Sequence, residues 1–80
     1  MKLTIINPHH KHEYAVQWVE AHTPAGFLVI QPEHAPMIFS LVAGSDFTFM
    51  LDTHEKKVIS LTRPGFMEIT RNSVLALVGE

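Results

Sequence analysis

Turn-forming residues interrupt this chain about every eight to twelve residues, a spacing typical of sandwiches and barrels built from short strands. Between the turns, no segment keeps the period of about 3.6 residues that an amphipathic helix requires. The chain is therefore predicted to be all-β. The turns are Asn7-Pro8, Thr23–Gly26, Pro32–Pro36, Gly44-Ser45, Asp52–Lys56, Pro64-Gly65 and Arg71–Ser73.

Side chains in two segments alternate with the period of two that half-buried strands show. In the segment 14–19 one face carries Tyr14, Val16 and Trp18, and in the segment 46–51 it carries Phe47, Phe49 and Leu51. Trp18 is accordingly expected to pack in the core. A third segment, Met37–Val42, is rich in β-branched and aromatic residues and follows Pro36, so it is predicted to be a strand rather than a helical turn.

Two other segments, Phe27–Ile30 and Leu75–Val78, are apolar at consecutive positions. Each is either a strand buried on both faces or a surface covered by another subunit. We favour a partner-covered surface for part of them. A single sheet of this composition would leave one apolar face in water. We therefore predict one domain over residues 1–80, a two-layer antiparallel β-sandwich of about eight to ten short strands.

Composition supports a folded domain that a partner stabilises further. Hydrophobic residues make up 46% of the chain and charged residues 18%, which favours a globule over a disordered tail. A domain of this length buries only roughly 60% of the surface of its unfolded chain, so its own stability is marginal.

Charge and motifs exclude several functions. The formal net charge is −2 and the six Lys and Arg residues are scattered, so no basic stripe for nucleic acid is present. The chain has no cysteine and no phosphate-binding P-loop motif. Its longest apolar run is far shorter than the roughly 20 residues that span a bilayer, so membrane association is expected only through a partner.

Histidines cluster at His9-His10-Lys11-His12, where His10 and His12 would lie on one side of an extended chain. Zinc needs three or four ligands, and Glu13 is the one acidic residue nearby. We therefore expect a solvated loop and no functional metal site, and a metal-dependent enzyme is the least favoured alternative. No serine or cysteine flanks His34, so we expect this residue to fix its loop by hydrogen bonds or to face a partner.

Two longer motifs carry a family resemblance: Gly26-Phe27-Leu28-Val29-Ile30-Gln31-Pro32-Glu33-His34-Ala35-Pro36 and Pro64-Gly65-Phe66-Met67-Glu68-Ile69. Together they resemble the amino-terminal domain of the epsilon subunit of F-type ATP synthase, which is called delta in mitochondria. Relatives typically read Gly-x-x-Gly-x-x-Pro-Gly-His-Ala-Pro. This chain has Val29 and Glu33 where glycines are common.

The resemblance implies a non-catalytic rotor subunit of the central stalk, without a cofactor, that links the gamma subunit to the c-ring and couples ion flow to ATP synthesis. It implies a position at the cytoplasmic face of the bacterial inner membrane, as part of the complex. The implied gamma-facing residues are His34, Ala35, Pro36 and Met37, and the implied c-ring-facing residues are Thr23, Pro24, Ala25, Gly26 and Phe27. The expected structural turns are at Gly26, Gly44 and Gly65.

Most bacterial relatives continue into a carboxy-terminal helical hairpin, whereas this sequence stops at Glu80. The resemblance therefore leads us to expect neither inhibition by helix extension nor ATP binding. The alternative function is a stand-alone β-sandwich that binds a small ligand or another protein.

Overall fold

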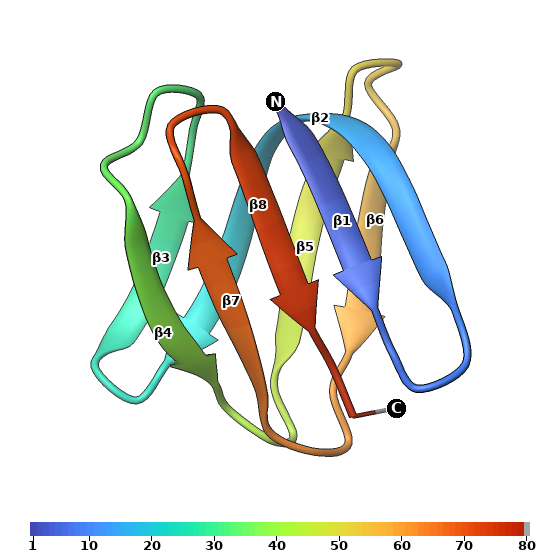
Figure 1. Ribbon diagram of the computed structural model, residues 1–80, viewed down its shortest axis with the longest axis vertical. Coiled ribbons are helices and arrows are strands. Elements are labelled where there is room, and N and C mark those ends of the chain that lie inside the picture. The colour runs from blue at the N-terminus through green and yellow to red at the C-terminus, as the bar shows by residue number, and fades with distance from the viewer. Residues whose placement is uncertain (80) are drawn as a thin grey trace.

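The computed structural model describes residues 1–79, and eight strands form within them (Figure 1). In chain order they are β1 (Lys2–Ile6), β2 (Lys11–Thr23), β3 (Gly26–Ile30), β4 (Met37–Leu41), β5 (Asp46–Leu51), β6 (Lys56–Ser60), β7 (Gly65–Ile69) and β8 (Ser73–Leu77). The all-β prediction is confirmed. The predicted strands at residues 37–42 and 46–51 are present as β4 and β5.

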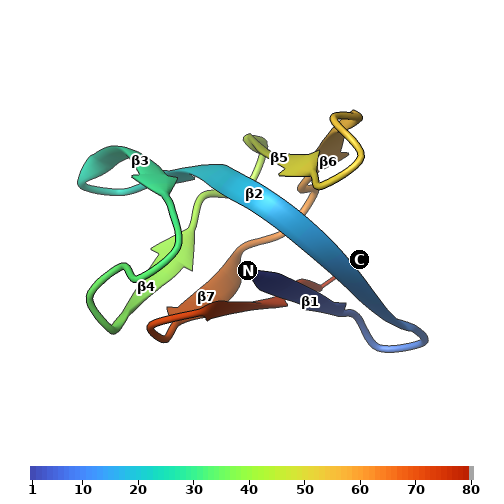
Figure 2. The same ribbon diagram turned by 90° about the horizontal axis from the view of Figure 1, so that it is seen from above.

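The strands form two layers that share β2. One layer has the order β4-β7-β8-β1-β2, and in the other β2 lies between β3 and β5, with β6 at the edge beyond β5. Viewed from above, β2 runs from one layer into the other (Figure 2). The strand pairs are antiparallel except β1–β8, which is parallel and joins the two ends of the chain through pairs such as Leu3 with Val74. The predicted two-layer sandwich is thus confirmed, with one parallel pair that turn spacing alone did not predict.

A β-bulge interrupts β2 where it changes layers. Val16 pairs with Leu51 and Trp18 with Met50, so Gln17 is an extra residue relative to β5. Because one extra residue reverses the alternation, Val16 and Val19 are both buried. The expectation that Trp18 shares the inward face with Tyr14 was therefore wrong: Trp18 is half-buried and lies outside the core cluster.

The core lies between the two layers and is entirely apolar among the described residues. Its largest fully buried side chains are Phe47, Phe49, Leu3, Ile30, Leu41, Met67, Ile69, Val16, Val19 and Val74. At the edge of this core, a Cβ atom on Gly65 would collide with the Leu77 carbonyl group, so glycine lets β7 approach β8 closely.

Three loop positions adopt the left-handed backbone region: Gly44, Glu33 and His54, the last at φ 70°. Gly44 does so at φ 80°, as its predicted role in a turn requires. Glu33 also does so at φ 65°, at the position where relatives commonly have glycine. A side chain with a Cβ atom makes this conformation costly, so Glu33 strains the loop before β4.

Candidate interaction surfaces

The predicted c-ring-facing residues form the tight hairpin between β2 and β3. Thr23 pairs with Gly26, and the Thr23 hydroxyl donates to the Gly26 carbonyl at 2.9 Å while accepting the Ala25 N–H at 3.1 Å. Gly26 has φ 130°, a conformation that L side chains rarely adopt. Pro24, Ala25 and Phe27 are exposed, so this hairpin presents a well-ordered tip to the solvent.

Phe27 is the second residue of β3, and its ring lies on the outer face of the hairpin. Its ring centroid lies 5.1 Å from that of His22, its cross-strand partner. The Phe27 side chain is 56% exposed. An aromatic ring supported by a neighbouring imidazole, yet open to solvent, is suited to contact a partner.

The predicted gamma-facing residues lie between the layers' edges, in the loop before β4 and at its first residue. His34 is half-buried, and its Nδ1–H donates to the Ala35 carbonyl at 2.8 Å. The loop is also tied to the β7–β8 turn, because the Glu33 N–H donates to the Arg71 carbonyl at 2.6 Å. His34 thus orders its own loop, while Ala35, Pro36 and Met37 remain exposed.

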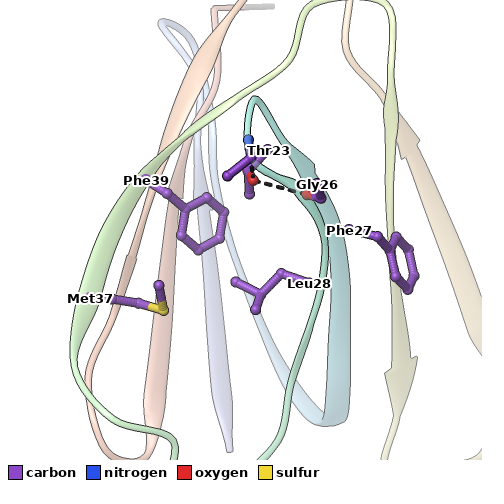
Figure 3. A pocket seen from close by; sticks show the side chains of 7 residues that line it. Thr23, Gly26, Phe27, Leu28, Met37 and Phe39 are labelled. Carbon is purple, nitrogen blue, oxygen red and sulfur yellow. Dashed lines mark hydrogen bonds between the residues drawn. The ribbon is translucent and has the colours of Figure 1, made fainter.

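An apolar hollow of about 260 Å³ connects the two predicted surfaces. It is lined by Thr23, Ala25, Gly26, Phe27, Leu28, Met37 and Phe39. The side chains of Leu28, Met37 and Phe39 converge across it, whereas the Phe27 ring lies on the far side of β3 (Figure 3). The hollow therefore joins Met37 to the hairpin, a juxtaposition that sequence spacing did not predict.

A second apolar surface covers the outer face of the layer that contains β4, β7 and β8. Of its residues, only Leu75 and Leu77 were considered from the sequence for a surface covered by a partner, within the segment Leu75–Val78. Strand register places Phe66, Leu77 and Ile6 in one row across the layer. The adjacent row contains Ile38, Glu68 and Leu75. Ile38 is 68% exposed, Phe66 57% and Leu77 44%. We call Ile6, Ile38, Phe66, Leu75 and Leu77 the outer apolar face. The alternation of side chains along residues 65–69, buried and exposed in turn, is the sequence feature that could have predicted the outer apolar face.

Two ion pairs lie on the surface of the domain. Lys2 Nζ is 2.7 Å from Glu13 Oε2, and Lys57 Nζ is 3.6 Å from Glu55 Oε2. The hydrogen bond from Lys2, followed by the charges of Lys2 and Lys11, lowers the pKa of the Glu13 carboxyl. Both pairs are exposed, so they contribute little to stability.

The histidine cluster does not form the solvated loop that was expected. Lys11 and His12 belong to β2, and only His9 and His10 precede it. Within residues 1–79, no three His, Cys, Asp or Glu side chains are grouped as the protein ligands of a zinc site would be. The same residues contain no helix with the length and apolar character that a membrane crossing needs.

The small sandwich leaves an ordered hairpin tip, a tied loop and an apolar outer face open to solvent, and exposed apolar patches of this kind are suited to contact with another protein. The sequence model described as "ATP synthase, Delta/Epsilon chain, beta-sandwich domain" matches residues 1–80. The chain therefore belongs to the delta/epsilon-chain β-sandwich family of ATP synthase, and the family resemblance drawn from its glycine and proline motifs is confirmed.

Solved structures share this fold at low sequence identity. A chain of the Euglena gracilis mitochondrial ATP synthase, in a structure of its OSCP/F1/c-ring, superposes with a TM-score of 0.83 at 16% identity, covering 98% of this chain and 49% of that one. A chain of the Tetrahymena thermophila mitochondrial ATP synthase central stalk and c-ring gives 0.77 at 15%, covering 100% and 63%. This chain thus spans about half to two thirds of those chains. No match was found among curated proteins.

Proposed function

We propose that this domain is the β-sandwich part of a non-catalytic rotor subunit in an F-type ATP synthase, where it holds the gamma subunit against the c-ring. Membership of the delta/epsilon family over residues 1–80 is the observation that carries this proposal. Both similar chains come from structures of ATP synthase that include the c-ring, which supports it. The domain reaches the membrane surface through these partners, at the cytoplasmic face of the bacterial inner membrane, and couples ion flow to ATP synthesis.

The gamma-binding surface in this proposal combines the loop 34–36 with Met37 and the outer apolar face. Ile38 follows Met37 directly and points to the opposite side of β4. Because β4 is the edge strand of its layer, the two candidate areas adjoin around that edge. The exposed side chains of Ile38, Phe66 and Leu77 would be covered by a partner, which removes apolar surface from water. Glu68 also lies within this face. Gamma must therefore place a complementary group opposite the Glu68 carboxylate.

The c-ring contact in this proposal is the hairpin tip at residues 23–27. Relatives often have an acidic or polar residue at the position of Phe27. With Phe27 exposed beside His22, this chain makes an apolar contact with the c-ring loops instead. Replacement of Phe27 by serine should weaken binding of the gamma complex to c-ring-containing membranes and leave gamma binding intact. Equal loss of both would place Phe27 in the gamma surface.

Co-purification with the gamma subunit of the same organism tests the main proposal. Ile38→Glu and Phe66→Glu should each weaken gamma binding by more than about 2 kcal/mol, as hot-spot substitutions do. His34→Glu and Met37→Glu should also weaken binding more than they lower the melting temperature. Val58→Glu is the matched control, because Val58 is 55% exposed but lies on β6 in the other layer.

The outcomes separate the proposal from its alternative. If the unmodified chain does not bind gamma at micromolar concentrations, the rotor function is rejected and a stand-alone binding domain is favoured. If it binds gamma and Val58→Glu is as damaging as Phe66→Glu, the rotor function stands and the assigned surface is wrong.

A further inference from the structure

The turn that leads from β1 into β2 holds its histidines in a fixed geometry. The Asn7 Oδ1 atom accepts the N–H of His9 at 2.9 Å and that of His10 at 2.7 Å. The Asn7 N–H in turn donates to the His10 carbonyl at 3.0 Å. From Lys11 onward, β2 pairs with β1, so the backbone that carries His12 is also fixed.

This backbone places His10 and His12 on one side of the strand. Their ring centroids are 5.9 Å apart, with the planes 19° from parallel. The stack continues through Tyr14, whose ring lies 6.4 Å from that of His12 and 5.1 Å from that of core residue Phe49. The side chains of Lys11 and Glu13 alternate to the opposite side, where Glu13 pairs with Lys2.

The separation of the two imidazoles suits one metal ion. A nitrogen ligand lies about 2.1 Å from a bound divalent metal, and the ring centroid lies roughly 1 Å farther. Two imidazoles on one ion therefore have centroids about 4.5 to 6.5 Å apart, for N–metal–N arrangements between a right angle and a straight line. The observed 5.9 Å falls inside this range. The rings are stacked, so each must rotate about its side-chain torsions to direct one nitrogen at a shared ion.

We propose that His10 and His12 form a two-imidazole chelate for a divalent transition metal, with Cu²⁺ as its preferred ion. Imidazole favours Cu²⁺, Ni²⁺ and Zn²⁺ over oxygen-seeking Mg²⁺ and Ca²⁺, and affinity among the first three peaks at copper. No third His, Cys, Asp or Glu joins the pair within residues 1–79. Water fills the remaining coordination positions, so the bound metal exchanges and stays open to a further ligand.

Titration of the full chain with Cu²⁺ alone, in a non-coordinating buffer, tests the site by calorimetry. His10→Ala and His12→Ala should each weaken binding by about 100-fold, because a second tethered ligand raises affinity by that order. Electron paramagnetic resonance of the Cu²⁺ complex should show two equatorial imidazole nitrogens, and one in each variant. His22→Ala is the control on the same strand and should change neither result.

A swapped variant tests whether the strand face matters. Lys11→His combined with His12→Lys keeps the composition but moves one imidazole to the opposite side of β2. It should lose affinity as His12→Ala does. Unchanged Cu²⁺ binding in this variant, or in both alanine variants, would overturn the proposal, as would stronger binding of Mg²⁺ than of Cu²⁺. The amino-terminal nitrogen is common to all these proteins, so its own Cu²⁺ affinity cancels in each comparison.

Discussion

Glu33 holds a backbone conformation that glycine adopts at lower cost. Its φ of 65° lies in the left-handed region, which costs an L residue roughly 1 to 2 kcal/mol. The loop keeps this shape because the Glu33 N–H donates to the Arg71 carbonyl and the neighbouring His34 ring donates to the Ala35 carbonyl. The strain is thus outweighed by contacts within the loop and with the β7–β8 turn.

Glu33→Gly should therefore stabilise the domain. We expect a gain of about 1 kcal/mol in the free energy of unfolding, the strain relieved less the extra freedom that glycine gives the unfolded chain. Urea denaturation of both proteins measures the difference. Glu33→Ala is the matched control, since it removes the carboxylate and keeps the Cβ atom. An equal gain from alanine would show that charge, not backbone strain, is responsible.

The Lys2–Glu13 pair leads to a prediction about how the stability of the fold depends on pH. The hydrogen bond from Lys2 lowers the pKa of Glu13 in the folded protein, so the pair stabilises the fold above the usual glutamate pKa. This stabilisation is lost as the pH falls through the lowered pKa. Carboxyl NMR titration should show the pKa of Glu13 below its usual range and should show it rise in Lys2→Met. An unchanged value in that variant would assign the shift to other charges.

At the scale of elements, the bulge in β2 decides which residues reach the core. Deletion of Gln17 would remove the extra residue, so that Val16, Trp18 and Val19 pair as consecutive residues with β5. Val19 and Ala21 would keep their inward direction, whereas the local twist that the bulge gives β2 between the two layers would be lost. We expect the deletion variant to have a lower melting temperature, monitored by circular dichroism.

A substitution of Gln17 distinguishes the effect of the bulge from the effect of the Gln17 side chain. Gln17→Ala removes only the hydrogen bond between Nε2 and His54 Nδ1, which spans 3.2 Å, and keeps the chain length. It should change the free energy of unfolding by less than about 1 kcal/mol. A loss as severe as that of the deletion would assign the effect to the Gln17 side chain rather than to the bulge.

Which elements were predictable depends on how far apart their partners lie in the sequence. Alternation correctly predicted β5, because Phe47 and Phe49 both face the core on an unbroken strand. The same pattern failed for Trp18, since a bulge depends on how two strands pair and leaves no mark in one strand's composition. The parallel β1–β8 pair joins residues at opposite ends of the chain, which local turn spacing cannot indicate.

The candidate surfaces were predictable only in part for the same reason. Family motifs identified the hairpin tip and the His34 loop as the surfaces to examine. The hollow between Leu28 and Met37 depends on two strands from different layers, and the outer apolar face depends on the register of β4, β7 and β8. The assignment of particular residues to gamma and the c-ring stays a prediction.

For the whole molecule, a small core leaves little reserve of stability. A domain of this length has a free energy of unfolding of about 4 to 12 kcal/mol. Phe49 is fully buried and its ring lies 6.2 Å from that of Phe47, so Phe49→Ala should cost about 3 to 5 kcal/mol. The expected result is a markedly lower melting temperature of the isolated chain, measured by near-ultraviolet circular dichroism. Exposed Val58→Ala, as a control, should remain folded.

Binding of gamma should restore part of this loss, because a partner that binds only the folded state stabilises it by mass action. The melting temperature of Phe49→Ala should therefore rise as gamma is added. A melting temperature independent of gamma concentration would show that the complex does not select the folded domain.

Because β2 belongs to both layers, the sandwich cannot yield to mechanical load as two separate plates would. Sliding one layer over the other would have to bend a covalent backbone and break its pairs with β1 and β5 together, rather than merely rearrange side chains. A force on the hairpin tip at Thr23–Gly26 is carried along that backbone into both sheets, down to the β1–β2 turn. The shared strand thus gives the domain resistance to shear.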